Sequence, residues 1–183
     1  MRILLTGKNG QVGFELHKKL SALGEVIATD REELNLVNPD AIRRFIDQKN
    51  PDIIINPAAY TAVDKAESEP DLAYQINTIA PEVLAEKAAE LDIPLVHFST
   101  DYVFDGLKKE PYLETDLTKP QSVYGKTKCE GEEKVRCHPK HIILRTSWVF
   151  GSHGNNFLKT MLHLIQEKDS LNIVNDQWGS PTS

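Results

Sequence analysis

Short apolar runs alternate along the chain with stretches in which apolar residues recur every three or four positions. Residues 53–55 are three consecutive isoleucines, a pattern typical of a parallel strand that is buried on both faces. In residues 15–23, by contrast, Leu16, Leu20 and Leu23 recur at helical spacing and share one face. The pattern therefore predicts strands and helices in turn.

Strands are predicted where an apolar run is short, and helices where the spacing is helical. The predicted strands cover residues 2–6, 26–29, 52–56, 94–98 and 141–145, with a sixth at 171–174. The predicted helices cover residues 15–23, 39–46, 71–91, 123–136 and 157–167. This alternation predicts an α/β fold, a doubly wound and mostly parallel sheet with helices on both faces.

Two local signals refine the helices. Asn38 is suited to cap a helix that has Pro39 at its first position, where the missing N–H of proline has no helical partner to lose. Pro81 lies inside the predicted helix 71–91 and indicates a break there, or a second helix that starts near Thr78.

Composition narrows the class of protein. The 183 residues suffice for one domain, or for one domain and the start of another. A formal net charge of -6 disfavours broad nucleic-acid binding, which needs a basic face. No apolar run has the length of a membrane span, and residues 3–5 are too short for a signal-peptide core, so we expect a cytoplasmic protein without membrane contact.

The cysteines and histidines do not indicate a metal site. Cys129 and Cys137 would lie about 12 Å apart along one helix, too far for a disulfide bond. No group of cysteines and histidines has the spacing of zinc ligands. His97 falls inside a predicted strand and is interpreted as a packed residue rather than a base.

Three glycines follow the first predicted strand and open the first helix. Gly7, Gly10 and Gly13 are spaced G-x-x-G-x-x-G. Such a turn lets backbone N–H groups and a helix N-terminus approach the pyrophosphate of a dinucleotide. The triplet alone is weak evidence, but its position between strand and helix favours a dinucleotide-binding loop.

The end of the second strand leaves the choice of cofactor open. Asp30 is placed to bond the hydroxyls of the adenosine ribose, which favours NADH. Arg31 is placed to meet a 2′-phosphate instead, which favours NADPH, although a plain charged turn explains it as well. Either NADPH or NADH therefore fits the sequence.

Candidate reacting groups follow later strands. Tyr124 and Lys128 are four residues apart on a predicted helix and share a face, so the ammonium is expected to lower the pKa of the phenol and make it a usable proton donor. Thr100 ends the fourth strand, before a long loop at residues 101–122, and is placed to bond a substrate carbonyl oxygen. A surface pair and a turn-capping hydroxyl are the alternatives.

Together these residues resemble the short-chain dehydrogenase/reductase superfamily, in its extended branch that modifies sugar nucleotides, and the resemblance covers essentially the whole chain. Its most specific segments are residues 62–67, 99–106 and 145–150. The full set is residues 5–13 (LTGKNGQVG), 62–67 (AVDKAE), 99–106 (STDYVFDG), 124–128 (YGKTK), 145–150 (RTSWVF) and 175–177 (NDQ).

The resemblance implies a Rossmann fold and a role for each matched residue. Tyr124 would donate the proton, Lys128 would bind the nicotinamide ribose, and Thr100, Asp101 and Trp148 would contact the sugar nucleotide. Without the resemblance, Trp148 would be interpreted as a core residue. The cofactor would be held by Gly7, Gly10, Gln11, Val12, Gly13, Asp30, Ala59, Tyr60 and Thr61, together with Tyr124 and Lys128.

In such enzymes hydride reduces the C4 ketone of dTDP-4-dehydro-L-rhamnose, giving dTDP-L-rhamnose for cell-surface polysaccharide. Similar proteins continue well past Ser183, so residues 1–183 are expected to be a truncated NAD(P)-binding domain with the beginning of a substrate-binding region from about residue 151. A magnesium ion at the contact of a homodimer is implied for some members. Glu15 is a candidate ligand, but its partners would lie past Ser183, so no metal is assigned.

Two other functions remain open. An epimerase or dehydratase of the same superfamily would recycle its cofactor, but a dehydratase usually has Asp-Glu after the threonine, where this chain has Asp101 and Tyr102. A non-catalytic regulatory subunit would bind the cofactor only, and the presence of Tyr124, Lys128 and Thr100 together argues against it.

Overall fold

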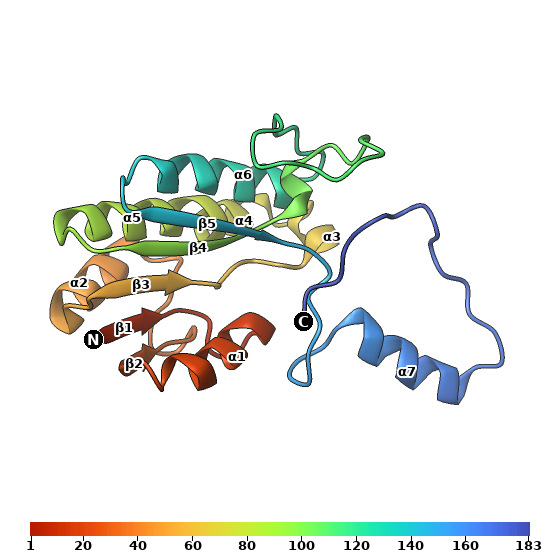
Figure 1. Ribbon diagram of the computed structural model, residues 1–183, viewed down its shortest axis with the longest axis horizontal. Coiled ribbons are helices and arrows are strands. Elements are labelled where there is room, and N and C mark those ends of the chain that lie inside the picture. The colour runs from red at the N-terminus through yellow and green to blue at the C-terminus, as the bar shows by residue number, and fades with distance from the viewer.

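A five-stranded sheet forms the centre of the computed structural model, which describes residues 1–183 (Figure 1). All neighbouring strands are parallel, in the order β2-β1-β3-β4-β5, which confirms the predicted α/β class. The strands are β1 (Arg2–Leu5), β2 (Glu25–Ala28), β3 (Ile53–Asn56), β4 (Leu95–Thr100) and β5 (His141–Thr146). The helices are α1 (Gln11–Leu20), α2 (Pro39–Lys49), α3 (Val63–Ala66), α4 (Pro70–Tyr74), the π-helix η1 (Gln75–Ile79), α5 (Ala80–Glu90), the 3₁₀ turn η2 (Asp101–Val103), α6 (Val123–Arg136) and α7 (Phe157–Glu167).

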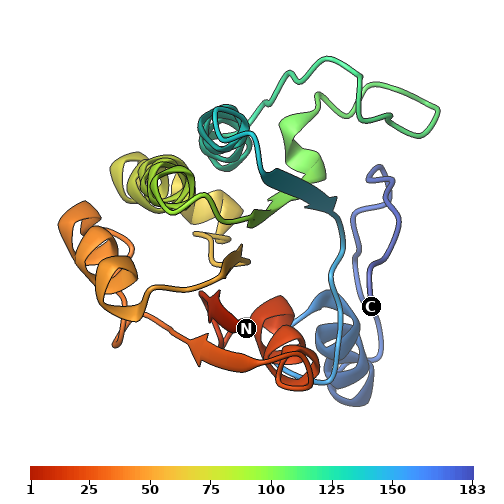
Figure 2. The same ribbon diagram turned by 60° about the vertical axis from the view of Figure 1, so that its left-hand side comes forward.

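Helices cover both faces of the sheet, unequally. Figure 2 shows α2, α5 and α6 side by side on one face, while α1 lies on the other. Leu4 belongs to the core beneath α2, α5 and α6, whereas Ile3 and Leu5 belong to the core on the α1 side. All three are completely buried, which explains why residues 3–5 of β1 are continuously apolar. Each such side chain contributes about 1.5–3 kcal/mol by leaving water.

The helix caps follow the sequence signals. Of the two outcomes predicted at Pro81, the break is wrong, whereas a second helix does start close to Thr78, because α5 begins at Ala80. Asn38 accepts a hydrogen bond from the N–H of Ala41 (3.0 Å) and Pro39 opens α2, as predicted. The chain continues without interruption from α4 through η1 into α5, with Pro81 in the first turn of α5. The wider π-turn just before Pro81 changes the hydrogen-bond register where proline, which has no N–H, cannot donate.

The predicted sixth strand at residues 171–174 is also wrong. A strand needs a neighbour for its hydrogen bonds, and this segment has none, with Ile173 and Val174 more than half exposed. The chain instead returns near its end, where Thr182 forms an isolated parallel bridge with Val149.

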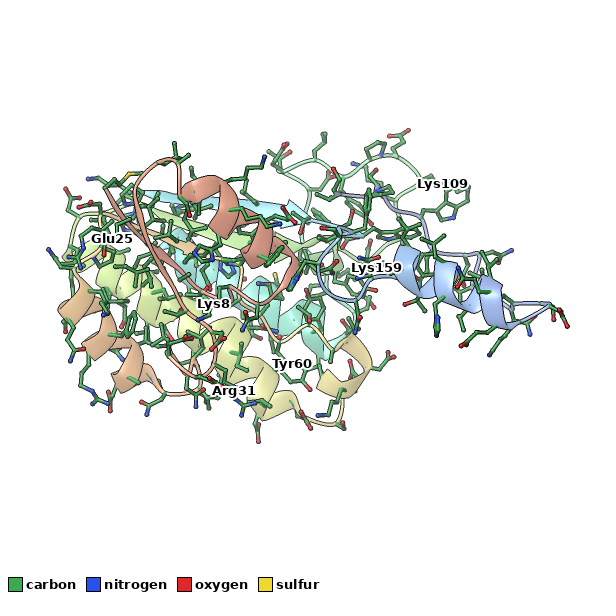
Figure 3. All side chains as sticks on the ribbon, turned by 90° about the horizontal axis from the view of Figure 1, so that it is seen from below. Lys8, Glu25, Arg31, Tyr60, Lys109 and Lys159 are labelled. Atoms are coloured by element: carbon green, nitrogen blue, oxygen red, sulfur yellow. The ribbon has the colours of Figure 1, made fainter.

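Helix α7 forms at the predicted residues but lies apart from the sheet (Figure 1). It contains no buried residue, and most of its apolar side chains, including Phe157 and Leu162, are exposed. Figure 3 shows Lys159 on α7 and Lys109 on the long loop, both toward this projecting end of the molecule. None of the helices combines the length and apolar character that crossing a membrane requires.

Candidate active site

A cleft of about 610 Å³ opens where the strands end. Its lining includes residues that directly follow β1, β3, β4 and β5, such as Gly7, Ala58 and Ser147, and two side chains of α6. From β1 the chain continues to β2 on one side of the sheet, and β3 lies on the other. Ligands of open parallel sheets bind beyond the carboxyl ends of the strands at such a point of reversal.

The geometry of the first loop requires its glycines. Gly7 has a left-handed backbone (φ +62°), which glycine adopts without strain. A Cβ atom on Gly13 would overlap the carbonyl oxygen of Gly7, so no larger residue fits there. Gly10 caps α1 without a side chain, which leaves the helix N-terminus open toward the cleft. A helix N-terminus presented in this way suits an anion such as a pyrophosphate.

Two of the expected cofactor residues, Asp30 and Tyr60, do not line the cleft, although Ala59 and Thr61 do. The Asp30 carboxylate accepts hydrogen bonds from the Asn9 carboxamide and from the N–H of Glu32, and it lies 3.9 Å from the Lys8 ammonium. The Asp30 carboxylate therefore lies beside the glycine loop and close to the Lys8 ammonium.

Tyr60 is turned away from the cleft and held by its neighbours. Its hydroxyl donates to Glu69 (2.7 Å), an interaction that raises the pKa of the phenol. Its backbone N–H donates to the side chain of Asn77 (2.8 Å), whose amide donates back to the Tyr60 carbonyl (3.1 Å). The backbone of Tyr60, rather than its ring, is thus the part fixed beside the cleft.

Thr100 ends β4 inside the cleft, as expected. Its hydroxyl accepts from the N–H of Tyr102 (3.2 Å) and donates to the Asp101 carboxylate (3.1 Å). Burial raises the pKa of Asp101, against hydrogen bonds from Thr100 and from backbone N–H groups that lower it. A hydroxyl and a carboxyl group therefore lie side by side in the lining of the cleft.

Tyr124 enters the cleft from the first turn of α6, which begins after Ser122 caps the helix by accepting from the N–H of Gly125 (3.0 Å). The rings of Tyr102 and Tyr124 pack edge to face, with their centroids 5.6 Å apart. The expected lowering of the Tyr124 pKa is wrong for the protein alone. Burial raises that pKa, and Thr100 only partly offsets it.

Lys128 lies one turn further along α6 and is completely enclosed. Its ammonium donates to the carbonyl oxygen of Phe98 (2.7 Å) and lies 3.3 Å from Nε2 of His97. Burial lowers its pKa to about 8, while the negative charge of Glu132 acts in the opposite direction. The ammonium still predominates at neutral pH.

Sequence reasoning missed several buried polar residues behind the site. Asn77 and Glu132 carry no motif, and His97 was interpreted only as packed. A single signal was available, because Glu132 follows Lys128 at the helical spacing that Lys128 itself keeps from Tyr124.

Trp148 lines the cleft, so the interpretation as a core residue is wrong. Its side chain is about half exposed and its backbone is left-handed (φ +49°). Gly179, from the returning end of the chain, packs so closely on the indole that a Cβ there would overlap it.

No group of three or more histidine, cysteine, aspartate or glutamate side chains is arranged to hold a metal ion. Glu15, the candidate magnesium ligand, lies 3.5 Å from Lys18 on α1.

Comparison with known proteins gives concordant matches. The family model described as the RmlD substrate binding domain matches residues 1–183. The dTDP-4-dehydrorhamnose reductase of Salmonella typhimurium is 49% identical over all of this chain, and the chain spans 62% of that relative's length.

Two solved structures are similar over nearly the whole chain. A dTDP-4-dehydrorhamnose reductase from Clostridium acetobutylicum has a TM-score of 0.96 at 50% identity, covering 100% of this chain and 65% of its own. One from Bacillus anthracis, in complex with NADP, has a TM-score of 0.94 at 42% identity, covering 99% and 65%. Because the family model matches every residue, the chain belongs to the RmlD substrate binding domain family.

Proposed function

We propose that the whole protein containing this chain reduces the C4 ketone of dTDP-4-dehydro-L-rhamnose with NADPH, giving dTDP-L-rhamnose. The observation that carries the proposal is a single cleft that unites the glycine loop with Thr100, Tyr124 and Lys128. The names of the similar proteins agree with it. Because the chain spans 62% of such a relative's length, the proposal concerns the whole protein and not this chain alone.

The glycine loop makes the tight turn that lets a cofactor pyrophosphate approach the backbone. This turn requires glycine, because a side chain on Gly13 would overlap the Gly7 carbonyl oxygen. The Gly10 N–H donates to the Gly7 carbonyl oxygen (3.0 Å) and closes the turn, so the backbone N–H groups of Gln11 and Val12 would hold the pyrophosphate at the start of α1. We assign NADPH for two reasons. Arg31 follows Asp30, and Lys8, which also pairs with Glu33, lies 3.9 Å from Asp30, so both would offer positive charge to a 2′-phosphate. The Bacillus anthracis relative was solved with NADP.

When bound, the nicotinamide supplies hydride to the carbonyl carbon. The Thr100 hydroxyl donates a hydrogen bond to the carbonyl oxygen, and Tyr124 transfers its phenolic proton to that oxygen. The raised pKa of Tyr124 keeps the phenol protonated before reaction. Lys128 lines the same cleft one turn further along α6, from where its ammonium would stabilise the phenolate that remains. A proton from water then restores the phenol.

The substrate side of the cleft comprises Asp101 and Trp148. Asp101 is placed to bond sugar hydroxyls, and the half-exposed indole of Trp148 offers a flat face for the sugar or base. Gly154 and Asn155 also line the cleft, which supports the beginning of a substrate-binding region at about residue 151.

The test follows NADPH absorbance in the full-length protein with dTDP-4-dehydro-L-rhamnose. The wild type should consume one NADPH per ketone, and Tyr124→Phe should lower kcat by about 100-fold or more. Tyr74→Phe, at a tyrosine on α4 that does not line the cleft, is the matched control and should retain activity. Sugar epimerisation without net NADPH loss, or cofactor binding without turnover, would refute the proposal.

A further inference from the structure

A buried chain of polar side chains crosses the sheet beneath the cleft. His97, in the middle of β4, is completely buried between Lys128 and Asn56. Its Nε2 lies 3.3 Å from the Lys128 nitrogen and its Nδ1 lies 3.0 Å from the Asn56 carboxamide. Asn56 in turn accepts a hydrogen bond from the hydroxyl of Thr6 (2.6 Å), the residue before Gly7. The polar chain thus joins α6 to the middle of β4, the end of β3 and the residue that follows β1.

Proton counting restricts how these groups interact. Burial, and secondarily the charge of Lys128, hold the pKa of His97 well below its ordinary value, so the ring is neutral. A neutral imidazole has one donor and one acceptor nitrogen, whereas an ammonium can only donate. A charged Lys128 therefore requires Nε2 to accept and Nδ1 to carry the proton.

Asn56 can satisfy either protonation state of the pair. In the structure its amide nitrogen faces the ring, which makes Nδ1 an acceptor and suits an uncharged Lys128 amine. Rotation of the carboxamide by half a turn presents its oxygen to an Nδ1–H group and its NH₂ group to Thr6, whose hydroxyl then accepts instead of donating. This arrangement suits the ammonium. The orientation of Asn56 and the tautomer of His97 therefore follow the charge of Lys128.

We propose that His97 is a positioning residue for Lys128, whose ammonium it holds by accepting a hydrogen bond at Nε2 while Asn56 fixes the ring from the other side. An ammonium has three protons. Phe98 and His97 take two of them behind the cleft, and the third is directed toward the cofactor ribose. This last consequence rests on the proposed function, whereas the contact with His97 does not.

Other titratable groups around Lys128 must stay unchanged in any test. Glu132 acts on it from one turn further along α6, and Tyr124 lies one turn before it. Glu132 is itself held by Arg145 and Arg136. Substitution at His97 leaves all of these in place.

The first experiment determines the tautomer of His97 in the wild-type chain, without cofactor, by ¹⁵N NMR of labelled histidine. At a pH of about 6.5, where Lys128 is charged and His97 is neutral, the proton should reside on Nδ1. Finding it on Nε2 under these conditions would overturn the proposal. This measurement needs no variant and no activity.

The second experiment measures the pKa of Lys128 by NMR of its labelled side chain in two variants. His97→Gln retains an acceptor close to the position of Nε2 and should leave that pKa near the wild-type value. His97→Leu removes the acceptor and should lower the pKa by about one unit, roughly tenfold in acid dissociation. An unchanged pKa in His97→Leu, or equal changes in both variants, contradicts the proposal. Thermal unfolding checks that each variant folds. If a variant does not fold, the His97 tautomer measured in the wild type still tests the proposal.

In the full-length enzyme the same variants should separate in their pH profiles. His97→Leu should shift the ionisation that limits kcat to lower pH, and His97→Gln should restore it. If the wild type reduces no ketone, the proposed function fails, while the two NMR measurements still decide the role of His97.

Discussion

Lys128 is the side chain at which burial and charge oppose each other most directly. The folded protein lowers its pKa to about 8, from an ordinary value of 10.5, chiefly because the amine is enclosed. Between these two values the unfolded chain binds more protons than the folded one, so stability rises with pH. Below pH 8 the folded state therefore carries the full cost of a buried charge, about 3 kcal/mol.

Replacing Lys128 by methionine should remove this cost and abolish reduction. At neutral pH the free energy of unfolding should equal or exceed that of the wild type, since a thioether fills similar space without charge. The excess should shrink as pH rises from about 8 toward 10.5. Urea unfolding at several pH values measures it. A wild-type protein that loses stability relative to Lys128→Met over that interval would contradict the assignment.

Helix α6 carries the proposed reacting groups and is fixed to the sheet from behind. Tyr124, Lys128 and Glu132 follow one another at intervals of four residues and therefore share a face. Glu132, completely buried, accepts two hydrogen bonds from Arg145 of β5 (2.8 and 2.6 Å) and one from Arg136 (2.9 Å). This bidentate pair sets the rotation of α6 about its axis, and with it the direction of Tyr124.

Glu132→Gln should destabilise the chain by about 3–5 kcal/mol, because it leaves the largely buried Arg145 without its counter-charge. Arg136, the other partner of Glu132, has a side chain that is 45% exposed. Arg136→Ala should therefore lower the free energy of unfolding by less than about 1 kcal/mol. Chemical denaturation of both variants measures the difference. Similar losses in the two would show that the contact with Arg145 is not what holds α6.

At the scale of the whole molecule, the chain divides into a packed sheet and a projecting end. The central strands are enclosed between α1 and the layer of α2, α5 and α6 (Figure 2). Helix α7 has 11 residues and buries none of them, and an isolated helix of that length is marginal in water. The two parts should therefore differ in local stability.

Hydrogen exchange measured by mass spectrometry should show this difference. Amides of β1, β3 and β4 should exchange slowly, near the rate of global unfolding, whereas those of α7 should exchange orders of magnitude faster. Protection of α7 equal to that of the central strands would require a packing partner for its apolar face.

Much of the fold and part of the site were predictable because they depend on neighbours in sequence. Continuous apolar runs mark strands buried on both faces, and Asn38 with Pro39 marks the start of α2. The glycine triplet and the pair Tyr124 and Lys128 were recognised from their spacing alone. The three glycines, Tyr124 and Lys128 all line one cleft. Parallel strands bring their carboxyl ends to one edge, so the residues that follow them converge.

What only the tertiary structure decided depends on which segments lie side by side. The π-turn continues the helix past Pro81, and residues 171–174 form no strand because no neighbour is adjacent. Burial reversed the expected direction of the Tyr124 pKa, since enclosure disfavours the phenolate more than nearby groups favour it. The contact of Lys128 with His97 joins residues 31 positions apart. Such contacts, and the loss of water around them, arise only when the sheet assembles. They therefore cannot be predicted from the spacing of residues along the sequence.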